Sequence, residues 1–156
     1  MRLYLVRHGE ALPGDVDPER RLSPRGRADA RKVAACLEPL GLRVEAVWHS
    51  PKARARQTAE ILAEALARAG DLVERDGLAP NDDVEPVASE VERRDGDLMI
   101  VGHMPLLGRL ASLLVAGDEA ADVVGFRTVT VCCLDRDDAG DGAWRIAWVV
   151  SPDTAA

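Results

Sequence analysis

Short, continuously apolar segments alternate along the chain with longer stretches in which apolar residues recur at helical spacing. The predicted strands are residues 3–6, 44–48, 72–74 and 98–101; 3–6 and 98–101 are apolar throughout, whereas the other two each contain one glutamate. Each is far too short for a membrane helix, and a polar turn or loop follows it before the next helical stretch. Strands of parallel sheets have this composition, because helices cover them on both faces. The pattern predicts an α/β fold with a mostly parallel sheet.

The predicted helices begin and end at residues that commonly mark helix boundaries. Ser23 is suited to cap the first helix with Pro24 at its first position, and Ser50 and Pro51 repeat this arrangement at the second. Gly117 is placed to end the last helix. The expected helices are residues 24–37, 51–69, 84–93 and 105–116.

The last third of the chain has a different pattern. Residues 128–134 and 144–150 are rich in β-forming side chains, and the turn-rich segment 135–142 between them indicates a hairpin. A length of 156 residues fits one domain, with residues 1–150 as its extent. Residues 151–156 are expected to be a frayed tail.

Composition and charge narrow the functional classes. With a formal net charge of −7 and only 3% aromatic residues, the chain is ill suited to bind nucleic acid or an anionic membrane. Its cysteines, Cys36, Cys132 and Cys133, match no metal-ligand spacing and indicate a reduced, cytoplasmic protein. Cys132 and Cys133 lie in a predicted strand, where we expect them to act as small apolar residues. No secretory signal is expected, because charged residues directly follow the first apolar segment.

Three of the predicted strands end in chemically unusual residues. Arg7 and His8 follow the first strand, Arg54 comes shortly after the second, and His103 follows the strand at 98–101. Ligands in open parallel sheets bind outside the carboxyl ends of the strands. We therefore expect these four side chains to share one pocket.

A pocket with two arginines and two histidines in an acidic protein indicates a small anionic ligand. The planar guanidinium of arginine suits phosphate oxygens, and nearby helix N-termini add backbone N–H groups. Neighbouring arginine charges should lower the pKa of a histidine and keep its ring neutral and nucleophilic. No carboxylate cluster of the kind that holds Mg²⁺ accompanies these residues, so we expect no metal and no cofactor. A phosphoryl group fits this pocket better than a carboxylate.

Three motifs carry a resemblance to a known family. They are Arg-His-Gly-Glu at 7–10, Ser-Pro-Lys-Ala-Arg-Ala-Arg-Gln-Thr-Ala at 50–59, and Gly-His at 102–103. Together they resemble the histidine phosphatase superfamily, also called phosphoglycerate mutase-like. The short chain and residues 20–26 are similar to its SixA-type phosphohistidine phosphatase branch. The resemblance covers residues 1–117 and implies a three-layer α/β/α sandwich.

The resemblance also implies roles for individual residues. His8 would be the nucleophile that accepts the phosphoryl group, and water would then release phosphate from the phosphohistidine. Arg7, Arg54 and His103 would surround the phosphoryl oxygens and stabilise their charge. Two further residues are expected to contact phosphate or substrate: Gly9 and Arg20.

The general acid that protonates the leaving group has no clear counterpart. Larger family members use a Glu after the third strand, but the segment 77–83 contains none. This departure resembles the SixA-type branch and disfavours mutase chemistry and the hydrolysis of alkyl phosphates. The remaining candidates are Asp82, Asp83 and Glu10, although Asp83 is also placed to cap the next helix and Glu10 to line the site.

Three other polar residues have structural interpretations. His49 has no counterpart role in the family and is expected to be structural. Arg56, two residues beyond Arg54, should point away from the pocket. Arg20 is equally consistent with a solvated loop residue.

The resemblance leaves the substrate open. A phosphorylated protein that carries phosphohistidine, or a small metabolite such as a sugar phosphate or nucleotide, would each fit a metal-independent phosphatase of this family. Because the general acid has no clear counterpart, the alternative to an enzyme is a non-catalytic module that binds phosphoproteins. Specificity is expected to come from the loops at 11–21 and 77–83.

Overall fold

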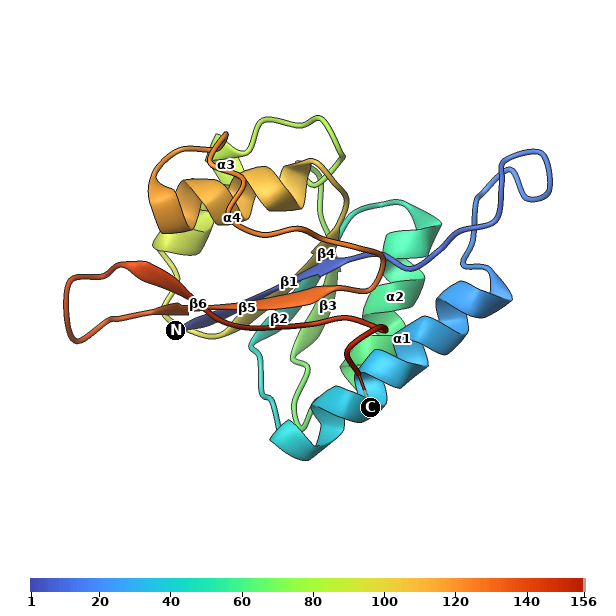
Figure 1. The fold of residues 1–156 in the computed structure, drawn as a ribbon, viewed down its shortest axis with the longest axis horizontal. Helices are drawn as coiled ribbons and strands as arrows, with labels where there is room; N and C mark the ends of the chain where they lie inside the picture. Colours follow the sequence, from blue (N-terminus) through green and yellow to red (C-terminus); the bar gives the residue numbers. More distant parts are fainter. Residues whose placement is uncertain (156) are drawn as a thin grey trace.

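A computed structural model describes residues 1–155 of the chain. These residues form a six-stranded sheet in the order β3-β2-β4-β1-β5-β6 (Figure 1). The strands are β1 Arg2–Arg7, β2 Ala46–His49, β3 Asp71–Glu74, β4 Leu98–Gly102, β5 Val131–Arg136 and β6 Trp144–Val150. The first four are parallel, and β5 and β6 add an antiparallel hairpin beside β1. The predicted, mostly parallel sheet is confirmed.

Helices cover both faces of the sheet. They are α1 Pro24–Leu37, the 3₁₀ helix η1 Glu38–Leu40, α2 Ala53–Glu64, α3 Glu85–Glu92 and α4 Leu106–Ala116. In Figure 1, α1 and α2 lie on one side of the sheet and α3 and α4 on the other. The three-layer sandwich is therefore as predicted. Each helix among residues 1–155 lacks the length and apolar character needed to cross a membrane.

Successive residues of β1 enter two different hydrophobic cores. Leu3 and Leu5 belong to the core that includes residues of α3 and α4, whereas Tyr4 and Val6 belong to the core that includes residues of α1 and α2. All four are at most 1% exposed. A strand buried on both faces has to be apolar at every position, which explains the unbroken apolar segment in the sequence.

The second helix is shorter than the sequence predicts. It spans Ala53–Glu64 instead of residues 51–69. Beyond it, the Ala67 N–H donates to the carbonyl oxygen of Leu42 over 2.8 Å. This segment therefore pairs with residues that precede β2, and those long-range hydrogen bonds replace helical ones. The other helices lie within one residue of their predicted bounds.

The hairpin begins later than predicted. β5 begins at Val131 and not at residue 128. The preceding residues form a turn in which the Thr130 N–H donates to the carbonyl oxygen of Arg127 over 3.1 Å. Val129 has a φ of 56°, which a regular strand does not allow. These residues therefore form a turn, although their side chains are typical of strands.

The prediction of a frayed tail is wrong for residues 151–155. The Ala155 N–H donates to the carbonyl oxygen of Ser151 over 2.8 Å, which closes a turn. Ala155 is only 6% exposed. Burial of this small apolar side chain and the turn together hold the segment against the fold.

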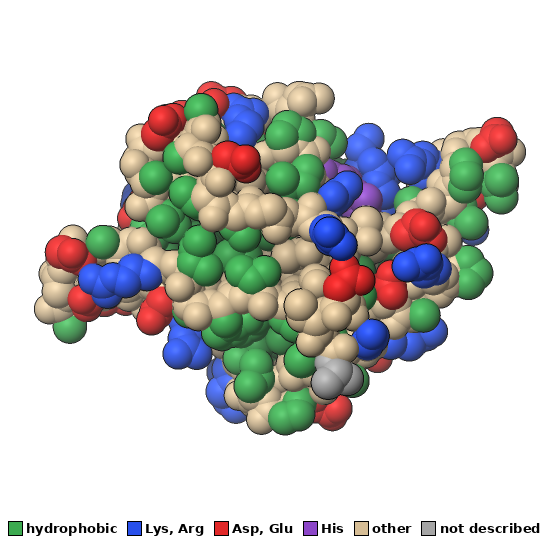
Figure 2. All heavy atoms as spheres, viewed as in Figure 1, with side chains coloured by type: hydrophobic (Ala, Val, Ile, Leu, Met, Phe, Trp, Pro, Cys, Tyr) green, Lys and Arg blue, Asp and Glu red, His purple; other side chains and the backbone are tan. Residues whose placement is uncertain are grey.

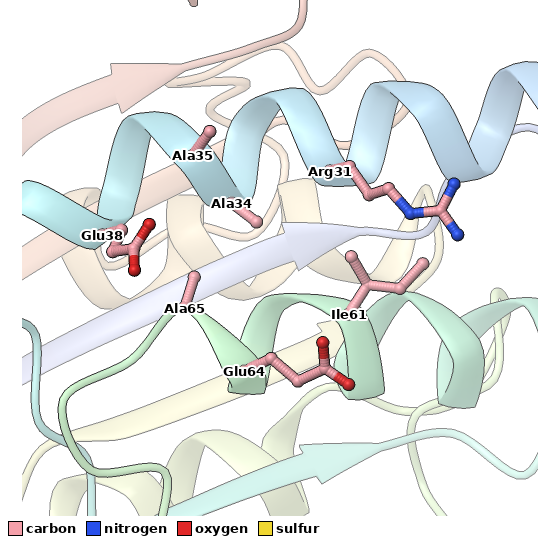
Figure 3. Close-up of a pocket in the computed structure, with 7 residues that line it drawn as sticks. All are labelled: Arg31, Ala34, Ala35, Glu38, Ile61, Glu64 and Ala65. Carbon is pink, nitrogen blue, oxygen red and sulfur yellow. The ribbon is translucent and has the colours of Figure 1, made fainter.

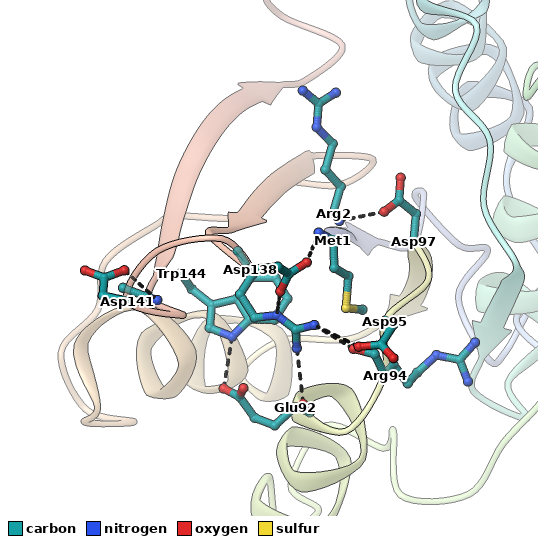
Figure 4. A network of polar contacts seen from close by, with 11 residues as sticks. Met1, Arg2, Glu92, Arg94, Asp95, Asp97, Asp138, Asp141 and Trp144 are labelled. Carbon is teal, nitrogen blue, oxygen red and sulfur yellow. Dashed lines mark hydrogen bonds and ion pairs between the residues drawn. The ribbon is translucent and has the colours of Figure 1, made fainter.

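Polar contacts at the amino-terminal edge of the sheet join the hairpin to the other layers (Figure 4). The N-terminal ammonium of Met1 forms an ion pair with Asp138 at 2.7 Å, and the Trp144 indole N–H donates to Glu92 over 2.9 Å. These contacts link the hairpin to the start of β1 and to the end of α3. Exposed ion pairs contribute little to the free energy of folding. We therefore infer that these contacts mainly fix the orientation of the hairpin.

A groove of about 310 Å³ runs between α1 and α2 on the outer surface (Figure 3). Its lining residues are Arg31, Ala34, Ala35, Glu38, Ile61, Glu64 and Ala65. Both helices run back from the carboxyl edge of the sheet, and the groove is formed mainly by their later turns. It therefore lies away from the residues that the sequence marks as functional.

Gly26→Ala is expected to destabilise the contact between α1 and the segment after β1. A Cβ at this position would lie 2.1 Å from the carbonyl oxygen of Glu10, so the backbone would have to move. We expect the free energy of unfolding, measured by urea denaturation, to fall by about 1–3 kcal/mol, as in other overpacked sites. Gly14→Ala is the control, because among residues 1–155, apart from position 14 and its two chain neighbours, no heavy atom lies within 4 Å of a Cβ placed there. Equal losses in both variants would contradict the close contact.

Candidate active site

The carboxyl ends of β1, β4 and β2 meet at one edge of the sheet. In the parallel register, Arg7 pairs with Gly102 and His49 pairs with Val101. The pairing continues past the strands, since the His8 N–H donates to the carbonyl oxygen of Gly102 over 3.0 Å. The predicted convergence of the three motifs is confirmed.

His8 follows β1 directly and is partly buried. Its Nδ1 lies 2.7 Å from the Gly9 carbonyl oxygen. Because a carbonyl oxygen only accepts, Nδ1 carries the proton and Nε2 keeps its lone pair. The pKa of His8 is lowered to about 4, mainly by burial and further by the charges of Arg54, Arg7 and Arg20. The sequence-based expectation named the arginine charges as the cause, whereas burial has the larger effect.

Gly9 and Thr58 tie the segment after β1 to α2. The Gly9 N–H donates to Thr58 Oγ1 over 3.0 Å, and the Thr58 hydroxyl donates to the carbonyl oxygen of Arg54 over 2.8 Å. A Cβ on Gly9 would lie 3.1 Å from the carbonyl oxygen of Gly26, so the backbones are in close contact. The Gly9 N–H, which was expected to contact phosphate, instead donates to Thr58.

Arg7 and Arg54 each bring a buried nitrogen with no partner to this edge. The Nη1 of Arg7 donates to the carbonyl oxygen of Phe126 over 2.8 Å, which fixes the guanidinium. Within residues 1–155, the Nε atoms of both arginines are buried and lack a hydrogen-bond partner. Such atoms are rare in folded proteins, and a bound anion would satisfy them. Figure 2 shows histidine side chains in a hollow with Lys and Arg side chains around them.

His103 follows β4 and is 1% exposed. Its ring centroid lies 4.9 Å from that of His8. Its Nε2 is 2.6 Å from the Ser50 hydroxyl oxygen, whereas its Nδ1 is buried without a hydrogen-bond partner among residues 1–155. The pKa of His103 is lowered to about 3, mainly by burial and further by nearby charges such as that of Arg54. Both rings are therefore neutral at physiological pH.

The Ser50 contact corrects the prediction that this serine caps α2. The helix begins at Ala53, and its N-cap residue is Lys52. The Ser50 hydroxyl oxygen accepts a long hydrogen bond of 3.3 Å from the Lys52 N–H and a short one links it to His103. Residues 50 and 103 are brought together only by the tertiary fold, so their hydrogen bond could not be predicted from the sequence.

Arg20 lies in the loop between β1 and α1, which projects from the body of the molecule (Figure 1). Its side chain is anchored, because Nε donates to the carbonyl oxygen of Leu12 over 3.2 Å. Its charge lowers the pKa of both His8 and Arg54. The guanidinium therefore lies near the pocket, although the residue is exposed.

The three candidate acids have different surroundings. Asp82 lines a cavity of about 280 Å³ next to Ser50. One of its carboxylate oxygens accepts the Ala79 N–H over 2.9 Å. Asp83 accepts the N–H of Glu85 over 3.1 Å, but the N-cap residue of α3 is Val84, so the prediction that Asp83 caps this helix is wrong. The remaining candidate, Glu10, accepts a hydrogen bond of 2.6 Å from the Ser23 hydroxyl.

The residues expected to be structural make contacts of other kinds. His49 is buried, and its Nδ1 donates to a backbone carbonyl oxygen over 2.9 Å. Arg56 is exposed and pairs with Glu60 at 3.6 Å. Cys132 and Cys133 are fully buried in β5, and burial raises their pKa to about 11 and about 12.

Sequence reasoning missed three groups at this edge: the Ser50 hydroxyl, the Thr58 hydroxyl and the Phe126 carbonyl oxygen. The two hydroxyls lie inside the motif at 50–59, so the motif marked the segment but not their partners. A backbone carbonyl carries no side-chain signal. Among residues 1–155, no three His, Cys, Asp or Glu side chains are grouped so that they could hold a metal ion.

Comparisons with known proteins identify the family. The sequence profile of the histidine phosphatase superfamily (branch 1) matches residues 3–80. An uncharacterized protein from Picosynechococcus sp. is 37% identical over 142 residues, which cover 82% of this chain and 86% of the relative. The chain belongs to the histidine phosphatase superfamily.

Two solved structures are similar over nearly the full length. The protein histidine phosphatase SixA complexed with tungstate has a TM-score of 0.84 and 26% identity, covering 98% of both chains. A protein from Agrobacterium tumefaciens assigned as the phosphohistidine phosphatase SixA has a TM-score of 0.77 and 28% identity, covering 97% of both chains. The phosphoglycerate mutase-like fold is confirmed, and the protein is a phosphatase.

The two neutral histidines should make the fold less stable as the pH falls. An unfolded histidine titrates near about pH 6.5, whereas burial lowers the folded-state pKa to about 4 for His8 and about 3 for His103. Between about pH 6.5 and pH 4 the unfolded chain binds more protons than the folded chain. The free energy of unfolding should therefore decrease as the pH falls through this window. Above the window these two groups should have no effect.

Urea denaturation at about pH 7.5 and about pH 5 measures this dependence. His103→Gln removes one of the two groups and should reduce the difference in unfolding free energy between the two pH values. An unchanged difference in this variant would contradict the lowered pKa of His103.

Proposed function

We propose that the protein is a metal-independent phosphatase that forms a phosphohistidine on His8 and acts on protein phosphohistidine. The observation that carries this proposal is the meeting of His8 with Arg7, Arg54 and His103, three of whose buried nitrogens lack a hydrogen-bond partner among residues 1–155. Fixed N–H groups that face no protein acceptor are suited to an oxyanion. The ligand of this pocket is thus a phosphoryl group.

The first step is attack by His8 on phosphorus. The Nε2 lone pair forms a P–N bond while the bond from phosphorus to the leaving group breaks and the leaving group takes that electron pair. Lowering the pKa of His8 to about 4, mainly by burial, keeps this lone pair available at neutral pH. Arg7 and Arg54 offer positive charge and N–H groups to the phosphoryl oxygens. The transition state of phosphoryl transfer needs positioning and positive charge above all.

In the second step, water attacks the phosphohistidine. A P–O bond forms, the P–N bond breaks, and the electron pair returns to Nε2 of His8. Inorganic phosphate leaves, and the neutral ring is restored. The Gly9 carbonyl oxygen holds the Nδ1 proton at 2.7 Å, which keeps Nε2 as the reacting atom in both steps.

The lack of a Glu in the segment 77–83 favours a phosphoramidate over an alkyl phosphate. An alkoxide leaves only with help from a strong acid, whereas the imidazole of phosphohistidine is a better leaving group. Where a proton is needed, we propose Asp82 as its source, because it lines the cavity next to Ser50, the residue bonded to His103. The similarity to the tungstate complex of SixA supports the same substrate class, since tungstate is a tetrahedral oxyanion like phosphate.

We also place the enzyme in the cytoplasm. The three cysteines are free thiols, and two of them, Cys132 and Cys133, are fully buried and adjacent in one strand. This usage fits a reducing compartment.

The substrate proposal is tested by comparing turnover of a phosphohistidine protein, a sugar phosphate and a nucleotide in EDTA. We expect the phosphohistidine protein to have the highest kcat/KM and EDTA to have no effect. His8→Ala should lower its turnover by about 10³-fold or more, as loss of a nucleophile does elsewhere. Faster turnover of a small metabolite would overturn the substrate assignment. Phosphate binding without turnover of any substrate would identify a binding module instead.

Arg54 and Arg56 form a matched pair for testing the phosphate contact. Both lie in the first turn or so of α2, but Arg54 brings a buried nitrogen to the pocket whereas Arg56 is exposed and pairs with Glu60. We expect Arg54→Ala to lower kcat by about 10²–10³-fold, the size of effect typical of a lost transition-state donor. Arg56→Ala should leave kcat unchanged, and a comparable loss in both variants would contradict the assignment.

A further inference from the structure

Ser50 and His103 form a buried pair that the proposed chemistry leaves unexplained. Ser50 is 0% exposed and His103 is 1% exposed. Their contact, from Oγ to Nε2, is 2.6 Å long. It joins the end of β2 to the end of β4, whose register is fixed by the Ser50 N–H, which donates to the carbonyl oxygen of Val101 over 3.2 Å. The contact is therefore part of a rigid backbone arrangement.

The direction of this hydrogen bond follows from counting donors and acceptors. The Lys52 N–H donates to the Ser50 Oγ over 3.3 Å and occupies one lone pair. The Ser50 hydroxyl proton then needs an acceptor, and within residues 1–155 the one contact suited to it is Nε2 of His103. If Nε2 carried a proton instead, the hydroxyl proton would be buried without an acceptor, which is costly.

The ring has one proton in its neutral form, so the direction of the bond decides where that proton lies. With Nε2 accepting from Ser50, the proton is on Nδ1. The Nδ1 atom is buried and has no hydrogen-bond partner among residues 1–155. A protonated Nδ1 is a donor that an oxyanion can satisfy, whereas a bare Nδ1 lone pair would repel the same oxyanion.

We propose that Ser50 is a positioning residue that holds His103 in the tautomer with the proton on Nδ1, so that the neutral ring donates a hydrogen bond to the phosphoryl group. This inference rests on the proposed role of His103 at the phosphoryl oxygens. It resolves a conflict in the site, because the pKa of His103 is lowered to about 3, mainly by burial, and the ring cannot act as a cation at neutral pH. A neutral donor also adds no positive charge beside the neutral ring of His8.

The tautomer of the resting enzyme is measurable without any substrate. Long-range proton–nitrogen correlation spectra of protein labelled at histidine nitrogen distinguish a protonated ring nitrogen from an unprotonated one, and the chain has only 3 histidines to assign. We expect the wild-type His103 to carry its proton on Nδ1. A proton on Nε2 in the wild type would overturn the proposal, even if no Ser50 variant folds.

Ser50→Ala should then change both the tautomer and the rate. We expect a mixture of His103 tautomers and a fall in kcat of about 10- to 100-fold, with little change in KM, as when the partner of a metal-bound histidine is removed. Ser50→Cys, of similar size but with a weaker donor, should lie between the two. A loss of activity with the tautomer unchanged, or an unchanged rate, would refute the positioning role.

Ser112→Ala is the matched control. Ser112 is also a 0% exposed serine with a hydrogen bond, in which its Oγ accepts the Val123 N–H over 3.2 Å, but it lies in α4 and outside the described pocket. It should leave the spectra and kcat unchanged. Failure of the proposed function has a different result: His8→Ala would then keep its phosphatase activity, while the tautomer of His103 is measured independently of turnover.

Discussion

The parallel hydrogen-bond register of β2, β4 and β1 is the constraint on which the site depends. Pairing of Arg7 with Gly102 places His8 beside His103, with ring centroids 4.9 Å apart. A shift of one residue would send every side chain of a strand to the opposite face of the sheet. Both faces are covered by apolar cores, so the register is held by the burial of the same residues that form the sheet. Packing of the apolar side chains thus fixes the positions of the polar site residues, which are not part of these hydrophobic cores.

Burial also sets the electrostatics of the site. The chain has a net charge of −7, yet arginine side chains gather around His8 at the edge where the strands end. Desolvation, more than these charges, lowers the pKa of both site histidines. Neutral rings suit the proposed chemistry, in which His8 offers a lone pair and His103 donates a hydrogen bond through the nitrogen that Ser50 would leave protonated. In the mechanism that we propose, positive charge at the phosphoryl group comes from the arginines.

Much of the architecture could be predicted from the order of apolar segments. β6 and α1 have their predicted bounds, because their patterns end at strong local signals such as the proline and serine that start α1. The prediction was wrong at residues 65–69, where backbone hydrogen bonds to the segment before β2 override local preference, and at residues 151–155, where a local turn and the burial of Ala155 order the segment. At Ser50 a tertiary contact likewise replaces the local one, since its hydroxyl bonds to His103 at the end of the neighbouring strand β4 instead of capping α2.

The sequence by itself determined the α/β class, the family resemblance and which strand ends carry the reactive side chains. These depend on residue type and on short intervals along the chain. Only the tertiary structure decided the protonated nitrogen of His8, the partner of His103, the anchoring of Arg7 on a backbone carbonyl and the near-burial of Ala155. Each of these depends on atoms brought together by folding or on backbone groups without a side-chain signal. The lowered pKa of the two site histidines was also decided by the tertiary structure, because the loss of water around a group is a property of the packed molecule.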